Sequence, residues 1–171
     1  DWHQEPIGTG IAVVPLADDM STPLAPFQTV MRGFADWQVF QFNRPMGISV
    51  VPKWYTIEGP FVVVQDGLYY CFYSGGAWHT PGYGVGVAVA EHPLGPWRDL
   101  DSHEGAAVLR TSETVVGPGH NSVVKGPDGR WWIAYHAWNR EGTKRQVCLD
   151  PIEWTKDGPR VTATVRSADI G

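Results

Sequence analysis

Gln65-Asp66-Gly67-Leu68-Tyr69-Tyr70-Cys71-Phe72-Tyr73 and Pro127-Asp128-Gly129-Arg130-Trp131-Trp132-Ile133-Ala134-Tyr135 are two copies of one pattern, set 62 residues apart. Each copy places an Asp-Gly turn between an apolar strand and an aromatic strand, which is the signature of a β-hairpin. The apolar strand before the turn repeats as well, at residues 61–64 and 123–124. A hairpin that recurs at this spacing in a β-rich chain predicts the blades of a β-propeller.

Two further similarities extend the repeat. Pro93-Leu94-Gly95-Pro96-Trp97 resembles Pro151-Ile152-Glu153-Trp154, so both units close on a Trp. Residues 8–14 resemble residues 84–90, the third strand of the first full unit, and an outer strand is expected near residues 27–31. The chain therefore begins in the middle of a repeat. We expect an all-β fold of the five-bladed propeller type, to which this chain supplies about two and a half blades, too few to close the ring.

The repeat divides the chain into three parts. Residues 1–50 form the outer half of one blade with a connecting segment, residues 51–111 a complete four-stranded blade, and residues 112–171 a second complete blade. The alternative is a β-sandwich whose hairpins resemble each other by accident, because Asp-Gly turns are common.

Composition agrees with short strands joined by tight turns. Nine Trp, six Tyr and six Phe stand among 20 Gly and 14 Pro, which leaves little room for helices. The net charge of −5 and the lack of a basic run argue against a nucleic-acid partner. No apolar stretch is long enough to predict a membrane span.

The cysteines and the first residues do not decide whether the protein is secreted or cytoplasmic. Cys71 and Cys148 stand singly in apolar strands and read as small buried hydrophobes rather than as a disulfide or a nucleophile. The chain opens at Asp1 with neither a Met nor a signal peptide, so we expect its natural start to have been removed or lost.

The repeat also pairs two chemically active residues. An offset of 62 carries Glu58 onto His120, both at the start of the first strand of a full blade. The innermost strand of a blade lines the central channel of a propeller, so we expect these side chains to converge near its axis. Taken singly, a Glu beside Gly-Pro is more often a solvated loop residue and a lone His is more often structural. Their equivalence in the repeat is what favours function.

A series of motifs follows in order from Trp54 to Trp154. They are Trp54-Tyr55-Thr56-Ile57-Glu58-Gly59-Pro60-Phe61, Tyr73-Ser74-Gly75-Gly76, Tyr83-Gly84-Val85-Gly86-Val87-Ala88, Gly117-Pro118-Gly119-His120-Asn121-Ser122, Tyr135-His136-Ala137-Trp138 and Leu149-Asp150-Pro151-Ile152-Glu153-Trp154. Together they resemble glycoside hydrolase family 43. The resemblance implies an inverting hydrolase acting on arabinose- or xylose-containing glycans.

In that resemblance Glu58 matches the general acid, which protonates the leaving oxygen. A base and a third carboxylate, which orients the acid and raises its pKa, are also implied, but nothing in this chain matches them, and their strands would precede Asp1. Asp1, Glu5, Asp18 and Asp19 fall in turns or outer strands and are not candidates. His120 matches a residue near a central ion or water, for which Ca²⁺, held mostly through waters, is the family's usual candidate.

Sugar binding requires aromatic platforms beside the acid. Trp54, Tyr55, Trp78 and His79 flank Glu58 or follow the second strand, and we expect them to contact substrate. Trp131, Trp132 and Trp154 are expected to fill the spaces between blades. Trp37, Phe40 and Phe42 either line a subsite or pack; the sequence leaves both open.

Two functions remain open at this point. The first is an enzyme whose missing blades lie upstream or in another chain, so that the isolated chain is inactive. The second is a catalytically incomplete sugar-binding or structural module that closes its ring as a homodimer.

Overall fold

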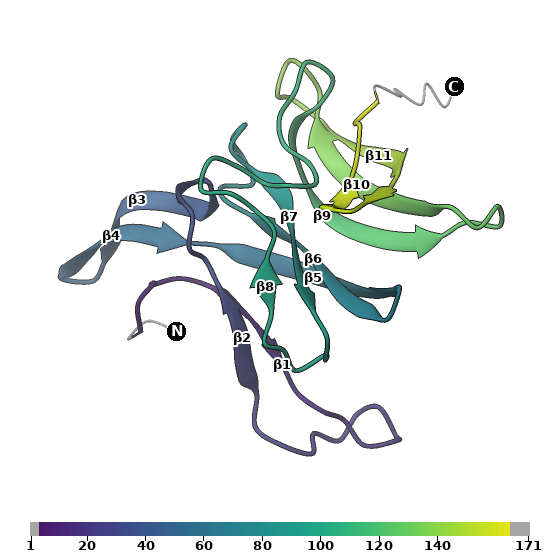
Figure 1. The fold of residues 1–171 in the computed structure, drawn as a ribbon. Coiled ribbons are helices and arrows are strands. Elements are labelled where there is room, and N and C mark those ends of the chain that lie inside the picture. The colour runs from purple at the N-terminus through teal and green to yellow at the C-terminus, as the bar shows by residue number, and fades with distance from the viewer. Residues whose placement is uncertain (1–3, 165–171) are drawn as a thin grey trace.

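The computed structural model describes residues 4–164 and shows a molecule built almost entirely from β-strands (Figure 1). In the described part a single 3-10 turn, η1 (Asp36–Gln38), interrupts them. No helix there is long and apolar enough to cross a membrane. The strands are β1 (Gly10–Val13), β2 (Gln28–Arg32), β3 (Val39–Met46), β4 (Ser49–Tyr55), β5 (Ile57–Gln65), β6 (Leu68–Gly75), β7 (Gly84–Ala90), β8 (Arg98–Asp99), β9 (Val116–Lys125), β10 (Trp131–Trp138), β11 (Arg145–Pro151), β12 (Glu153–Thr155) and β13 (Gly158–Arg160).

The first complete blade is the antiparallel sheet β5-β6-β7-β8, whose strands lie in chain order. Asp66 and Gly67 turn β5 into β6 with positive φ angles of 52° and 79°, the left-handed geometry that a two-residue hairpin loop needs. β7 consists of Gly, Val and Ala and is buried along its whole length. The blade begins at Ile57 rather than at residue 51, because residues 51–55 belong to β4 and pair with β3.

The second blade has three strands in its sheet, in the order β9-β10-β11, rather than the four expected. After β11 the Ile152 amide donates to the Trp131 carbonyl, and the chain then folds on itself as the hairpin β12–β13. Gly158, with φ at 107°, closes that hairpin. The outer residues therefore pair with each other instead of extending the sheet. Residues 165–171 of the expected blade lie outside the described residues.

The half blade is the pair β1–β2, which lies beside β5. The Thr9 hydroxyl joins the two sheets, since it donates to the Ile57 carbonyl and accepts from the Ile57 amide, at 2.9 and 3.1 Å. Ile11 and Met31 pack with Ile57 and Cys71 in a small shared core. Glu5 and Asp19 lie here in exposed turns, while Asp1 is outside the described residues.

The hairpin β3–β4 is an arm that projects from the blades (Figure 1). The sequence predicted only a connecting segment over this part. Gly47, with φ at 62°, forms the turn, and Ile48 beside it is fully exposed. An exposed ion pair of 2.6 Å between Lys53 and Asp36 ties the base of the arm to η1.

The main core lies between the two blades. Phe72, Val85 and Val87 of the first blade pack against Ile133 and Tyr135 of the second. Two of the three Trp expected here close this space. The Trp154 ring meets Tyr70 edge-on at 4.8 Å, and the Trp131 Nε1–H donates to Gln65 Oε1 at 2.8 Å.

Trp132 differs, because its ring lies beneath the Arg130 guanidinium. Of the two cysteines, Cys71 is buried and Cys148 half-buried, and both are free thiols.

Candidate functional site

Glu58 stands at the start of β5, where the pairing with β6 is irregular. Its backbone pairs with Ser74, and a bulge separates that pair from the next, at Phe61. Gly59 supplies the positive φ of 58° inside the bulge. The Tyr83 hydroxyl donates a hydrogen bond of 2.7 Å to Glu58 Oε1. One oxygen of the Glu58 carboxylate is therefore held by a fixed donor.

The structure brings His120 to the same place, as the repeat predicted. A Cβ on Gly59 would lie 3.4 Å from His120 Cε1, so the Gly59 backbone rests against the imidazole. The His120 amide donates to the Ser74 hydroxyl at 2.7 Å, and its φ of 53° is left-handed. Such a backbone in a non-glycine residue is costly and is found preferentially at functional sites.

Tyr83 is a functional candidate that the sequence reasoning did not single out. It is buried at 1% exposure, and its ring lies on Gly119, where an added Cβ would meet Tyr83 Cε1 at 1.9 Å. Burial and, after it, the neighbouring Glu58 raise the pKa of Tyr83 far above its usual range. The phenol therefore stays protonated and remains a donor to Glu58 at all working pH values.

His136 and Arg145 were also missed as site residues. The His136 ring stacks on Tyr83 at 5.9 Å and on His120 at 6.4 Å. Arg145 Nη1 lies 3.2 Å from His136 Nε2. Burial, followed by the charges of Arg145 and His120, lowers the pKa of His136, so the neutral ring accepts from the guanidinium.

The signal for His136 was present in the repeat. An offset of 62 carries it onto Ser74, the residue opposite Glu58. No comparable sequence signal marks Arg145.

Two of the predicted aromatic platforms join this array. Trp78 is 41% exposed, and the Arg145 guanidinium lies 4.8 Å from its ring centre. His79 meets Trp78 edge-on at 5.2 Å and Phe40 of the arm at 5.7 Å. Contacts thus run without a break from Glu58 through Tyr83, His136 and Arg145 to Trp78.

The other two predicted platforms are placed differently. Trp54 is only 7% exposed, and Arg44 covers its ring at 4.3 Å, so its face is not open to a sugar. Tyr55 turns toward the half blade, where its side chain packs against Gly33. Trp37 packs in the interior against Tyr73, whereas Phe42 stays 58% exposed on the arm.

The metal expectation finds no ligand set in residues 4–164. No group of three His, Cys, Asp or Glu side chains there is arranged to hold an ion. Ca²⁺ takes six to eight oxygen ligands, and His120 offers one imidazole. The described residues therefore do not fit a directly coordinated calcium.

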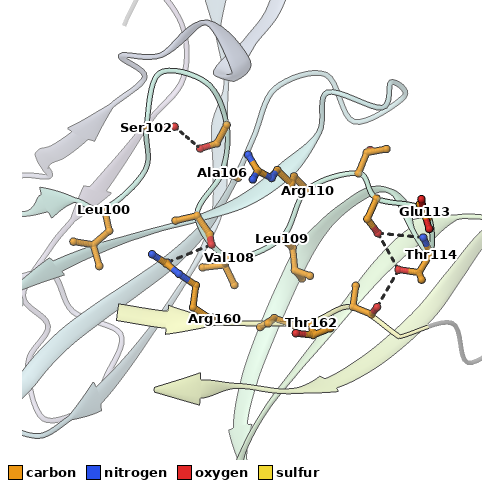
Figure 2. Close-up of a pocket in the computed structure, with 16 residues that line it drawn as sticks. Leu100, Ser102, Ala106, Val108, Leu109, Arg110, Glu113, Thr114, Arg160 and Thr162 are labelled. Atoms are coloured by element: carbon orange, nitrogen blue, oxygen red, sulfur yellow. Dashed lines mark hydrogen bonds between the residues drawn. The ribbon is translucent and has the colours of Figure 1, made fainter. Parts of the chain in front are cut away.

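The structure also contains a cavity away from Glu58. Its volume is about 710 Å³, and it opens between the segment that joins the two blades, residues 100–114, and residues 160–163 at the end of β13 and after it (Figure 2). Arg110 and Arg160 border it, together with small and hydroxyl side chains. None of its lining residues belongs to the array around Glu58, so it is a separate feature.

Comparison with known proteins gives a consistent family. The family model described as glycosyl hydrolases family 43 matches residues 1–159. The β-D-galactofuranosidase xynD of Aspergillus niger is 32% identical over 116 residues, which make up 65% of this chain and 32% of that protein. The extracellular exo-α-(1→5)-L-arabinofuranosidase ArbA of Cellvibrio japonicus is 23% identical over 158 residues, 87% of this chain and 44% of that protein.

Solved structures agree on the fold. A thermostable family-43 glycoside hydrolase superposes with a TM-score of 0.74 and 30% identity, over 96% of this chain and 52% of that one. An exo-1,5-α-L-arabinanase from a bovine ruminal metagenomic library gives a TM-score of 0.68 at 22% identity, over 92% of this chain and 51% of that one.

The extent of these matches confirms the expected partial propeller. The chain spans about half of these solved structures and a third to less than half of the curated relatives. It is all-β and belongs to the five-bladed propeller type, which excludes the sandwich alternative. With the family model matching nearly the whole sequence, the chain belongs to glycosyl hydrolases family 43.

Proposed function

We propose that this chain carries the general-acid part of an inverting glycosidase that hydrolyses arabinose- or xylose-containing glycans. One observation carries the proposal: Glu58 lies at the inner end of β5, held by the Tyr83 hydroxyl and set beside His120. A carboxyl with one oxygen tied to a fixed donor and the other free is suited to proton delivery.

The chemistry follows from this arrangement. Tyr83 occupies Oε1 of Glu58, so Oε2 is the oxygen that hands its proton to the departing glycosidic oxygen. An inverting enzyme also needs a second carboxylate, about 6.5–9.5 Å from the first, to activate water on the opposite face of the sugar ring. This chain spans about half of the family-43 structures that it matches, so we infer that the base and the third carboxylate come from blades outside this sequence and that the isolated chain is inactive.

The proposed sugar contacts are Trp78 and His79. Trp78 is 41% exposed and offers its ring as a platform for a sugar, and the Arg145 guanidinium stacks on that ring. The two curated relatives are named for galactofuranosides and arabinofuranosides, which supports a furanose substrate for this site. For Trp54 and Tyr55 the contacts favour packing roles, since Arg44 covers the Trp54 ring and Tyr55 packs against Gly33.

The test replaces Glu58 with Gln in a form that contains the complete propeller. Hydrolysis of substrates with poor leaving groups should fall by at least about 1,000-fold, while activated aryl glycosides, which need little protonation, should lose far less. Glu91→Gln, an exposed turn residue after β7, is the matched control and should leave both rates unchanged. Equal losses on both substrate types would instead assign Glu58 to binding.

A second candidate is a catalytically incomplete module that binds sugar or serves as scaffold and closes its ring as a homodimer. The observation that favours it is exposed apolar surface on both the first and the second blade. Val62 and Val64 on β5 are about half exposed, and Val124, Val147 and Leu149 on the second blade are 57%, 81% and 51% exposed. Blades of a closed propeller bury such faces against their neighbours.

Calcium beside His120 would be held through water and through residues beyond those described. Its signature is a rise in melting temperature as calcium is added. An unchanged melting temperature across the titration would count against it.

A further inference from the structure

The hydroxyl of Tyr73 has one proton to donate but lies within hydrogen-bond distance of two carboxyl groups. Tyr73 is fully buried in β6. Its Oη lies 2.7 Å from Asp99 Oδ2, 2.6 Å from Asp101 Oδ2 and 2.9 Å from Gln38 Nε2. Two half-buried carboxylates thus share one buried phenol.

Counting protons fixes the state of this cluster. Gln38 Oε1 accepts from the Phe34 and Ala35 amides at 2.7 and 3.1 Å, so Nε2 is the atom that donates to Tyr73. The phenol has a single proton and donates to only one carboxylate. The second carboxyl, at hydrogen-bond distance from the same oxygen, must bring a proton of its own.

Asp101 is the residue that holds this extra proton. Burial and then the charge of Asp99 raise the pKa of Asp101 to about 7, against the partial opposing effect of Tyr73. Asp99 Oδ1 already accepts from the Asp101 amide at 3.0 Å. The arrangement that satisfies every donor is a protonated Asp101 donating to Tyr73 and Tyr73 donating to Asp99.

The equivalent position in the second blade gives an internal comparison. An offset of 62 carries Tyr73 onto Tyr135, whose hydroxyl donates to Asp150 Oδ2 at 2.7 Å. The other oxygen of Asp150 accepts from the amide and the hydroxyl of Thr164. Asp150 is thus a single carboxylate with three donors and needs no added proton. Of these two equivalent clusters, the one in the first blade is the one that requires a protonated carboxyl.

The cluster connects the loop that borders the cavity with the segment that precedes Glu58. Asp101 Oδ1 accepts from the Ala107 amide, which closes the loop of residues 101–107. That loop includes Ser102 and Ala106 at the wall of the 710 Å³ cavity (Figure 2). On the other side, the Gln38 carbonyl accepts from the Thr56 amide at 2.8 Å, two residues before Glu58.

We propose that Asp99, Asp101 and Tyr73 form a proton-operated latch that fastens the 101–107 loop to the first blade. With the proton bound, every member of the cluster is paired. When the proton leaves, two half-buried carboxylates face the one buried hydroxyl, and their repulsion opens the loop. This latch is independent of the proposed hydrolysis and is tested without any measurement of activity.

The surrounding groups leave the extra charge uncompensated. In residues 4–164 neither carboxylate forms an ion pair with Lys or Arg. Cys71 lies on the same strand, and burial raises the pKa of its thiol to about 12, so it stays neutral. His103 and Glu104 on the loop are exposed, and His103 meets Phe34 edge-on at 5.3 Å.

The direction of the pH dependence follows because Asp101 binds its proton more tightly in the latched state than in the opened state. The latched state binds a proton that the opened state, with an ordinary carboxyl pKa near 4, releases. The free energy that favours the latched state is therefore greatest below pH 4. It decreases as the pH rises from about 4 to about 7 and is constant above that pH. Opening should increase about tenfold per pH unit across this window.

The test is amide hydrogen exchange at Ala107, corrected for the intrinsic pH dependence of exchange. Protection should fall about tenfold per pH unit between pH 5 and 7 in the unaltered protein. In Asp101→Asn it should not depend on pH, because the Asn amide donates to Tyr73 permanently. Asp150→Asn, the matched change in the second blade, should weaken protection near Thr164 equally at all pH values and leave the slope at Ala107 intact. His103→Gln should also keep that slope.

Two results would overturn the latch. One is a flat profile at Ala107 in the unaltered protein, and the other is a slope that survives Asp101→Asn. If Asp101→Asn does not fold, a carboxyl ¹³C titration of the unaltered protein decides the matter. A midpoint near 7 for Asp101 supports the latch, and a midpoint near 4 contradicts it.

Discussion

The Tyr83 hydroxyl donates the hydrogen bond that holds Oε1 of Glu58. Hydrogen bonds to charged groups contribute about 1.5–3 kcal/mol, and this one is made by a donor whose ring packs on Gly119 and stacks with His136. Tyr83 is buried against Glu58, which we propose as the acid, so we assign it a positioning role. Its contribution should appear in the step that needs a well-placed proton.

Tyr83→Phe in a complete propeller should therefore reduce kcat on poor leaving groups by about 10- to 100-fold, the rate equivalent of losing such a bond. KM should change little, because the Tyr83 side chain is buried and not accessible to a sugar. Tyr135→Phe removes the same kind of bond, to Asp150 in the second blade, and should lower the melting temperature without changing the dependence on leaving group. A Tyr83 variant that behaves like the Tyr135 variant would reduce Tyr83 to a structural role.

At the scale of elements, β9 positions the site because it passes close to Tyr83. Gly119 has no side chain, and no other residue fits there, since a Cβ would lie 1.9 Å from the Tyr83 ring. The approach also brings His120, the next residue, against Gly59. One close contact between strands thus sets the relative position of both inner residues.

Gly119→Ala should consequently destabilise the fold by about 1–3 kcal/mol, the usual cost of overpacking a filled site, and displace Tyr83 from Glu58. Urea unfolding measures the first effect, and activity on poor leaving groups measures the second. Gly82→Ala is the control, because its added Cβ meets only the Thr80 hydroxyl at 3.4 Å. A Gly119 variant as stable and as active as the Gly82 variant would mean that Tyr83 moves aside freely.

The sequence predicted those elements that repeat and missed those that occur once. The Asp-Gly hairpins at residues 66–67 and 128–129 are local signals, and the equivalence of Glu58 and His120 followed from them. The arm β3–β4 has no second copy to compare with, so it was read as a connection. Tyr83, His136 and Arg145 meet through stacking across strands that are far apart in sequence, which no local pattern reports. In residues 4–164 the second sheet lacks the fourth strand that the repeat predicted, because the residues after Ile152 pair with each other as a short hairpin instead of pairing with β11. The first blade has no such hairpin, so the repeat could not predict it.

At the scale of the whole molecule, two apolar surfaces stay uncovered in the described residues. On one side the sheet β1–β2 has only two strands, and Val62 and Val64 of the neighbouring β5 are about half exposed. On the other side the face of the second blade bearing Val147 and Leu149 has no neighbour within the described residues. Unpaired strand edges and apolar sheet faces favour association.

For the chain on its own we expect a two-fold dimer. Two copies of two and a half blades amount to five, and a two-fold axis lets each unfinished end meet its own counterpart, as isologous interfaces require. The half blades would merge at one junction, and the second blades would pack face to face at the other. The two-fold turns the two sites toward opposite faces of the ring, so Glu58 of one copy does not face Glu58 of the other. Closure then restores buried surface without supplying a base, and the dimer should show no hydrolysis.

Light scattering at micromolar concentration measures this directly, with twice the chain mass as the expected result. Val147→Asp together with Leu149→Asp places charge at the centre of one junction and should shift the mass to that of a monomer, because a buried unpaired charge is strongly unfavourable. Ile48→Asp puts a charge on the arm, where the side chain is fully exposed, and should leave the dimer intact. If the unaltered chain is already a stable monomer, the apolar faces are instead the sites where the remaining blades of a longer protein pack.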